Sequence, residues 1–200
     1  GVEIVDAAAH TFVYLADPDG NGLELYVDRP REQWRQKDGQ IAMATDPLDV
    51  ESLLAEVGEE VEPWAGMHPG TDIGHVHLQV SDLGRAEAFY RDLLGLDVTQ
   101  RGYPGALFLS AGGYHHHLGL NTWAGVGATA PPPNVVGLLS LALRIPDAGA
   151  LQAALQRLQA SGIEVEDRRD GEYAPSVFLR DPDGHGVELL VQKSIESTEE

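Results

Sequence analysis

Cysteine is absent from this chain of 200 residues. Without cysteine the protein forms no disulfides, offers no thiolate ligand to zinc and has no cysteine nucleophile. A reducing compartment is compatible with that composition, and we expect a cytoplasmic protein.

Basic residues are scarce as well. Lysine and arginine number 13 against 32 aspartates and glutamates, and the net charge is −19 with histidine neutral. This charge repels nucleic acid and anionic membrane surfaces, so we expect neither as a partner. No apolar run approaches the roughly 18 residues needed to span a bilayer. The first residue is Gly1, without methionine, and we interpret it as a processed or truncated start.

An internal repeat indicates the fold. The segment ADPDGNGLELYVD at 16–28 recurs as RDPDGHGVELLVQ at 180–192, so that Asp17 matches Asp181 and Glu24 matches Glu188. Proline, aspartate and glycine favour a tight turn between two strands. Because the similarity continues upstream of both turns, we predict three consecutive antiparallel strands in each copy.

A second repeat pairs a strand with a helix. Residues 76–98 resemble residues 141–165, and in the first copy His75 and His77 alternate with aliphatic residues. Asp82 is placed to cap a helix that ends at Gly95. Together the repeats predict an α+β protein with two consecutive βαβββ modules and a partial module ahead of them.

Domain boundaries follow from these modules. We expect the last strands of an incomplete first domain at 1–30 and a connector with one short helix at 31–72. A complete two-module domain should occupy 73–193, with a solvated tail at 194–200. Three isolated strands would expose apolar surface. We therefore expect these strands to pack on the rest of the chain, to pair across a homodimer, or to belong to a longer protein.

Several long strings resemble the vicinal oxygen chelate superfamily of glyoxalases, bleomycin-resistance proteins and extradiol dioxygenases, and they are most similar to bacterial catechol-2,3-dioxygenase-like proteins. The strings are GHVHLQVSDL, FYRDLLGL, LFLSAGGYHHHLGLNTW, DPDGNGLELYVDRPREQW and DPDGHGVELLV. The resemblance implies that paired modules form a cupped, barrel-like, antiparallel-rich mixed sheet around one divalent metal.

Metal ligands in this family come from the first and last strands of each module. The resemblance assigns these places to His75, His117, Ser140 and Glu188. Serine is a poor ligand for transition metals, so the expected metal set is His75, His117 and Glu188. Two imidazoles and one carboxylate suit Fe(II), with Mn(II) or Zn(II) as alternatives. We expect His77 to be a packing or supporting residue.

The catalytic acid and base of the family precede the glutamate. In the N-terminal fragment, Tyr14 and His10 occupy these places ahead of Glu24. At the tyrosine's place before Glu188 stands Phe178. The predicted catalytic residues are therefore His10 and Tyr14, which belong to a partial first-domain site.

The preferred functional hypothesis is a metal-dependent extradiol (catechol-2,3-) dioxygenase-like oxidoreductase that cleaves a small aromatic diol, in a truncated or catalytically degraded form. An alternative is a ligand-binding or resistance protein of the same fold without catalysis. A glyoxalase-type lyase is the third hypothesis.

Overall fold

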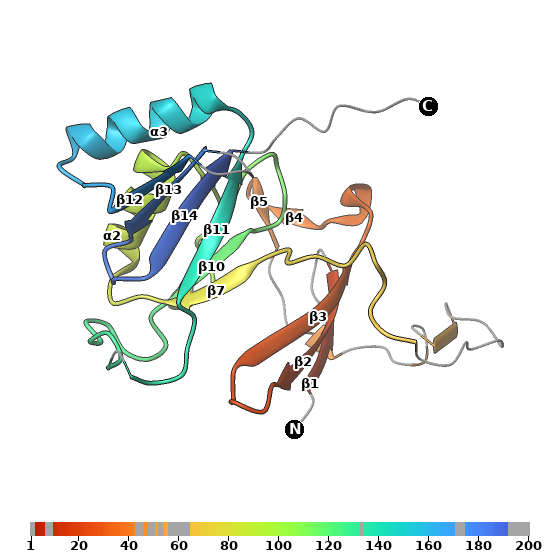
Figure 1. The fold of residues 1–200 in the computed structure, drawn as a ribbon. Helices are drawn as coiled ribbons and strands as arrows, with labels where there is room; N and C mark the ends of the chain where they lie inside the picture. The colour runs from red at the N-terminus through yellow and green to blue at the C-terminus, as the bar shows by residue number, and fades with distance from the viewer. Residues whose placement is uncertain are drawn as a thin grey trace. The chain divides into compact units, whose positions relative to one another are not determined.

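A computed structural model of the chain shows two compact units, residues 1–75 and 76–200 (Figure 1). The predicted tail and most of the predicted connector helix lie outside the residues that the structure describes. None of the described helices is long and apolar enough to cross a membrane. The described residues are 3–6, 10–42, 46–47, 51, 54–55, 65–132, 134–170 and 175–191.

The first unit contains the three consecutive antiparallel strands that the repeat predicts. They are β1 (Glu3–Asp6), β2 (His10–Ala16) and β3 (Gly22–Asp28). The turn between β2 and β3 is closed by the Asp17 carboxylate, which accepts hydrogen bonds from two backbone N–H groups of its own turn. The unit also contains β6 (Asp46–Pro47) beside β1, the 3₁₀ turn η1 (Arg31–Gln33), and the hairpin of β4 (Gln36–Lys37) and β5 (Gln40–Ile41).

The second unit contains both complete modules. In each module the first strand pairs in parallel with the last, which gives the strand orders β7-β10-β9-β8 and β11-β14-β13-β12. No ladder among the described residues joins the two sheets, so the barrel is not closed. The first module comprises β7 (Val76–Gln79), α2 (Leu83–Glu87), η2 (Ala88–Leu93), β8 (Asp97–Gln100), β9 (Ala106–Ser110) and β10 (Leu118–Asn121). The second comprises β11 (Ser140–Ile145), α3 (Ala148–Ala160), β12 (Asp167–Asp170), β13 (Pro175–Arg180) and β14 (Gly186–Val191).

The first helix begins and ends as the sequence predicts, and the second has the same kind of cap and stop. The Asp82 and Asp147 carboxylates each accept a hydrogen bond from a backbone N–H of the first helical turn. Gly95 and Gly162 follow the helices with φ angles of 92° and 74°, which favour glycine. After Glu87 the first helix is wound more loosely than expected, as the π-helix η2.

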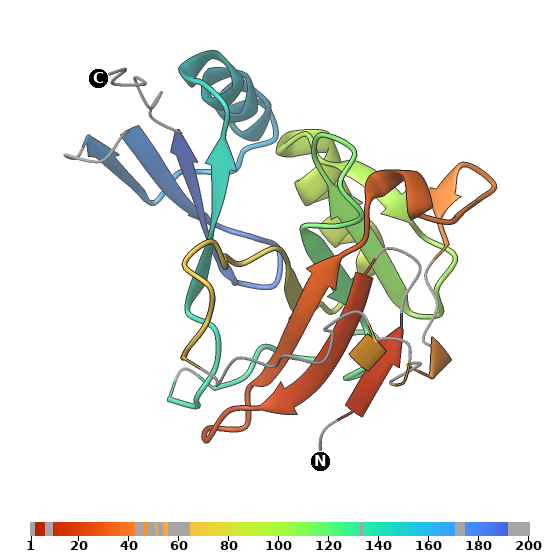
Figure 2. The same ribbon diagram turned by 90° about the vertical axis from the view of Figure 1, so that its right-hand side faces the viewer.

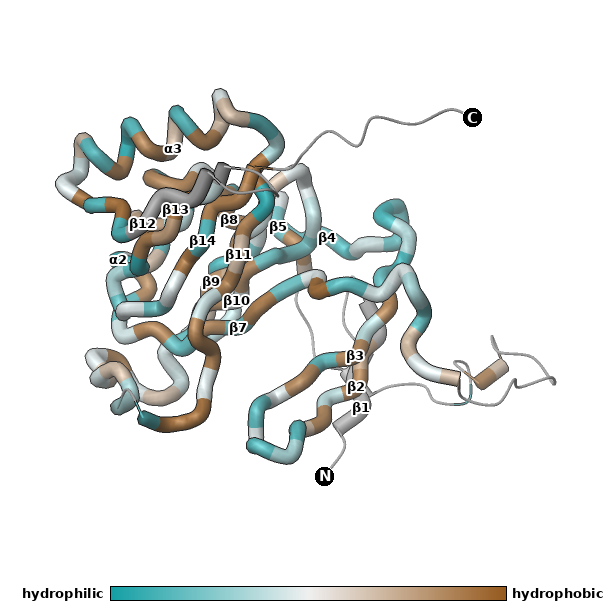
Figure 3. The backbone as a smooth tube through the Cα atoms, viewed as in Figure 1, coloured by the Kyte–Doolittle hydropathy of each residue, from teal (hydrophilic) through white to brown (hydrophobic). Residues whose placement is uncertain are grey.

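One hydrophobic core serves both modules. Apolar residues alternate with polar ones along α3, which lies beside the sheet of β11 and β14 (Figures 2 and 3). Since one cluster of buried residues contains side chains from both modules, the two modules bury their apolar faces in a common core. The buried residues include Leu78, Phe89, Leu109, Leu118, Leu120, Leu151, Ala154, Leu158, Val177, Leu179, Val187 and Leu189.

A buried polar contact also joins the modules. The hydroxyl of Tyr90, on η2, donates to the Asp181 carboxylate across 3.0 Å, and both residues are buried. Asp181 lies at the start of the DPDG turn between β13 and β14. From the same turn, Asp183 accepts a hydrogen bond from the Ser81 N–H and lies 3.6 Å from the Arg85 guanidinium. The turn of the second module is therefore fastened to the helix start of the first.

The charge on Asp181 is held by its neighbours. Burial alone would raise the pKa of this carboxyl, but hydrogen bonds from His185 and Tyr90 outweigh it, so the pKa is lowered. Hydrogen bonding to Asp181 raises the pKa of His185, whose Nδ1 lies 2.9 Å from the carboxylate. Burial raises the pKa of the Tyr90 hydroxyl, which stays protonated and donates. The three groups therefore form one charge-assisted network.

Candidate metal centre

The candidate centre is built on two parallel neighbouring strands. In the register of β7 and β10, His77 lies opposite Gly119. A Cβ atom at position 119 would lie 2.9 to 3.0 Å from three atoms of the His77 ring. Glycine is therefore needed for the imidazole to lie against β10.

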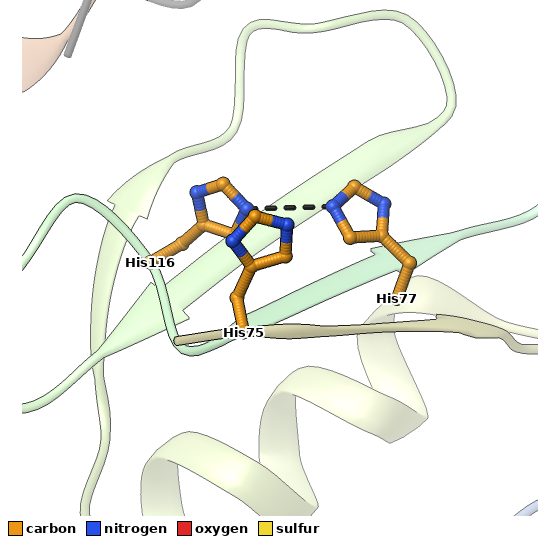
Figure 4. A group of neighbouring side chains, drawn as sticks. All are labelled: His75, His77 and His116. Carbon is orange, nitrogen blue, oxygen red and sulfur yellow. Dashed lines mark hydrogen bonds between the residues drawn. The ribbon is translucent and has the colours of Figure 1, made fainter. Parts of the chain in front are cut away.

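Three histidine side chains converge here (Figure 4). His75 directly precedes β7 and His77 lies on it, so alternation along the chain turns both to one side. His116 comes from the segment before β10. One ring nitrogen from each histidine lies within 4.8 Å of the others, and the Nε2 atoms of His77 and His116 are 3.4 Å apart.

The His116 and His77 rings differ in how deeply they are buried. His116 is 3% exposed, and the Phe108 ring stands edge-on to it with centroids 4.9 Å apart. His77 is exposed, so the group has one buried and one accessible nitrogen ligand within the second unit. Of the three histidines, His77 is therefore the one through which solvent reaches the group.

The spacing of the nitrogen atoms suits a metal. Two imidazole nitrogens bound tetrahedrally at about 2.0–2.1 Å from one ion lie about 3.3 Å apart. The observed separation of 3.4 Å between His77 and His116 is close to that value. Imidazole ligands are accepted by zinc, iron, nickel and copper, so the donor set fits a divalent transition metal without choosing one.

Of the predicted ligands, only His75 joins this group. His117 Nδ1 accepts a hydrogen bond of 3.2 Å from the Ala111 N–H. Glu188 accepts a hydrogen bond of 2.6 Å from the Ser176 hydroxyl. Among the described residues, the group contains neither of them. The set of His75, His117 and Glu188 therefore stays a prediction.

His75 also contacts side chains of β3 in the first unit. Its Nε2 atom lies 3.3 Å from a Glu24 carboxylate oxygen, and the two side chains are 4% and 9% exposed. The Tyr26 ring stacks on the His75 ring with centroids 4.9 Å apart. A buried carboxylate beside an imidazole fixes the orientation of the ring.

The predicted acid and base lie on β2. Tyr14 stands directly across from Glu24 in the β2–β3 register, as Phe178 stands across from Glu188 in the β13–β14 register. The aromatic position beside each glutamate thus carries a hydroxyl in the first unit and none in the second. His10 begins β2, and its side chain lies outside the part of the chain that the structure describes.

From the sequence, His77 is expected to be a packing or supporting residue, and the expected metal set does not include His116. For His77 the signal was present, because alternation already placed it on the same face as His75. For His116 the signal was misleading. Three consecutive histidines do not show which of them faces a metal, because β10 begins only at Leu118.

The class of protein follows from comparison with known proteins. The profile of the Glyoxalase/Bleomycin resistance protein/Dioxygenase superfamily matches residues 72–189, and the chain belongs to this superfamily. A glyoxalase/dioxygenase from Nostoc punctiforme has a similar fold, with a TM-score of 0.53 and 19% identity over 66% of this chain and 100% of that one.

Two individual relatives within this superfamily are dioxygenases by name. The chain is 46% identical to a catechol-2,3-dioxygenase of Bacillus subtilis over 180 residues, which are 88% of this chain and 60% of that protein. It is 32% identical to biphenyl-2,3-diol 1,2-dioxygenase 3 of Rhodococcus globerulus, over 60% of this chain and 62% of the relative. The chain thus spans about 60% of the length of these relatives.

Proposed function

We propose that this chain is a metal-dependent extradiol dioxygenase-like protein that acts on a small aromatic diol. The observation that carries the proposal is the 46% identity to a catechol-2,3-dioxygenase over 88% of the chain. Both relatives described above are named for substrates with two neighbouring aromatic hydroxyls. Fe(II) is the proposed metal, the cytoplasm the proposed compartment and a homodimer the proposed assembly.

Two ligand sets compete for the metal, and both include His75. The predicted set adds His117 and Glu188, whereas the observed group adds His77 and His116. A bound divalent metal would polarise the oxygens of a vicinal diol and so favour loss of their protons. Within the second unit, His116 would be held by its packing on Phe108, and Ser176 would orient Glu188 by its hydrogen bond.

Proton transfer is proposed for the first unit. Tyr14 lies beside Glu24 and carries a hydroxyl that can donate or accept a proton. His10 is the proposed base because the unperturbed imidazole pKa lies near neutrality. Residues 3–28 would then belong to the last three strands of a first module with its own site.

One observation favours a second candidate, a ligand-binding protein of the same fold without catalysis. Phe178 lies directly across from Glu188, so the second unit has no hydroxyl at the place where the first unit has Tyr14. A site of this kind would bind a ligand without moving its protons. This candidate predicts metal or ligand uptake without any cleaved product.

The test combines metal content with ring cleavage. The full chain is loaded without oxygen with Fe(II), Mn(II) or Zn(II), bound metal is measured by mass spectrometry, and catechol consumption is followed after air is admitted. We expect stoichiometric metal and a ring-cleaved product with Fe(II). Metal without product would support the ligand-binding candidate, and absence of both would refute the dioxygenase proposal.

Single variants separate the two ligand sets. His75→Ala should weaken metal binding at least about tenfold under either set, since loss of even a supporting residue commonly costs that much. His116→Ala should do so only for the observed group, and Glu188→Gln only for the predicted set. His68→Ala is the control, because His68 is exposed and bonds only locally in its turn. Equal metal loss in all four variants would show that none is specific.

A further inference from the structure

The turn between β2 and β3 contains an asparagine followed by a glycine. Asn21 and Gly22 are both exposed. The chain has two other asparagines, Asn121 and Asn134, and these are followed by threonine and valine. Both of those residues branch at Cβ and crowd their own main-chain nitrogen, whereas glycine has no side chain. Asn21 is therefore the asparagine whose side chain is most open to the next main-chain nitrogen.

That nitrogen can react with the side-chain amide. A bond forms between the Gly22 nitrogen and Asn21 Cγ, the bond from Cγ to Nδ2 breaks, and Nδ2 leaves as ammonia with the proton of the Gly22 N–H. Water then opens the resulting five-membered imide and gives aspartate or isoaspartate. The reaction consumes only water. Neighbouring atoms leave room for it, since a Cβ atom at position 22 would meet no atom within 4 Å.

Asp17 holds the Asn21 amide in its unreacted form. Asp17 Oδ2 accepts a hydrogen bond of 2.8 Å from Asn21 Nδ2, and Oδ1 accepts one of 2.8 Å from the Asn21 N–H. The Asp17 N–H donates to the Asn21 carbonyl across 3.0 Å. The hydrogen bond from the Asn21 side chain lowers the pKa of Asp17, so the acceptor is charged. These three bonds fix the amide in one orientation and so slow the attack.

Loss of the amide would reverse this contact. An anionic oxygen in place of Nδ2 would lie where a donor now stands 2.8 Å from Asp17 Oδ2. Two carboxylates at that distance repel each other, and no hydrogen bond joins them while both are charged. Isoaspartate would also add one methylene group to the main chain directly before β3. The turn would therefore open after the reaction.

The second DPDG turn lacks this weakness. By the repeat, His185 corresponds to Asn21 and Asp181 to Asp17. The His185 N–H and Nδ1 contact the Asp181 carboxylate at 2.8 and 2.9 Å, in the same pattern as Asn21 on Asp17. An imidazole has no amide nitrogen to lose. The two turns thus have the same closure, of which only the first can be opened by deamidation.

We propose that Asn21 is a site of spontaneous deamidation, and that the reaction converts the β2–β3 turn from a closed to an open form. The turn precedes Glu24 by two residues, and Glu24 pairs with Tyr14 in the ladder that the turn connects. The reaction would therefore loosen the hairpin that carries both side chains. This inference does not depend on the dioxygenase proposal, because no step uses a metal or a diol.

The experiment follows the three asparagines in one sample. The full chain is kept at mildly alkaline pH, where the attacking nitrogen loses its proton more readily, and samples taken over time are digested. Mass spectrometry measures conversion of amide to acid, and an isoaspartate-specific methyltransferase detects the rearranged product. We expect the peptide with Asn21 to convert at least about tenfold faster than those with Asn121 and Asn134, because its next residue has no side chain.

Variants test the chemistry and the role of Asp17. Gly22→Val should bring conversion of Asn21 down to the rate of the other asparagines. Asp17→Asn should speed it about tenfold, because a hydrogen bond to a charged group no longer holds the amide. If Asn21 converts no faster than the other two asparagines, or if Gly22→Val leaves its rate unchanged, the proposed site is wrong. A slower reaction in Asp17→Asn would contradict the protective role of the carboxylate.

A matched pair of variants tests the opening of the turn. Asn21→Asp reproduces the charge of the product, whereas Asn21→His introduces the residue of the second turn. Hydrogen exchange of residues 19–28 should be at least about tenfold faster in Asn21→Asp than in the parent, and close to the parent in Asn21→His. Equal exchange in Asn21→Asp and the parent would refute the opening.

Discussion

Replacement of Tyr90 by phenylalanine should destabilise the chain through one lost hydrogen bond. The ring is fully buried between the modules, and phenylalanine would preserve its packing. The change removes only the hydroxyl that donates to Asp181 across 3.0 Å. The effect on stability therefore isolates this contact.

The magnitude follows from the charge and burial of the acceptor. Asp181 is 5% exposed and its pKa is lowered, so the acceptor is a buried carboxylate. Loss of a hydrogen bond to a charged group costs about 1.5–3 kcal/mol. Because His185 and two backbone N–H groups still contact Asp181 in the variant, we expect about 2 kcal/mol.

Urea denaturation followed by circular dichroism measures this cost. Tyr90→Phe should lower the midpoint without changing the slope of the unfolding transition. The matched control is Tyr103→Phe, at a half-buried tyrosine packed on Phe108 and Trp123, which should change stability by less than about 0.5 kcal/mol. If the two variants lose the same small amount, the buried hydrogen bond makes no net contribution and our reasoning fails.

Two further changes test the site and the turn. Gly119→Ala would place a methyl group 2.9 Å from the His77 ring, so it should displace the imidazole and weaken metal binding about tenfold. Gly137→Ala is the control, because its position has open space around it and metal binding should not change. Metal titration of both variants measures the difference. His185→Gln should cost on the order of 1 kcal/mol between about pH 4 and 6.5. In the parent, the stabilisation from the Asp181 charge is lost as pH falls through the lowered pKa of Asp181, and the stabilisation from the His185 charge is lost as pH rises through the raised pKa of His185. The stability difference between parent and variant should therefore shrink outside this window. Urea midpoints measured across pH would contradict this reasoning if the stability difference stayed constant.

The modules could be predicted because several local signals agree. The strands and helices repeat in the sequence, and the caps at Asp82 and Asp147 and the stops at Gly95 and Gly162 mark the helix ends. Each signal depends on residues close together in the chain. The positions of the strands and helices along the chain therefore follow from local residue preferences and from the spacing of apolar residues.

The histidine group could be predicted only in part. The neighbours His75 and His77 share a face by alternation, but the partner His116 comes from a bend before β10 rather than from a strand. Its neighbour His115 is also fully buried, so burial does not distinguish the two histidines. Where a strand begins depends on pairing with β7 and β9, which the local sequence does not specify.

The two DPDG turns show how one motif can serve different purposes. In the first unit, the Asp17 carboxylate is bonded within its own turn, including by the side chain of Asn21. In the second unit, the corresponding Asp181 reaches Tyr90 in the other module. A substitution at Asp17 is therefore a local matter, whereas a substitution at Asp181 also removes the acceptor of Tyr90 in the other module. Across related sequences this pair should covary, and the two modules of the second unit should be inherited as a block.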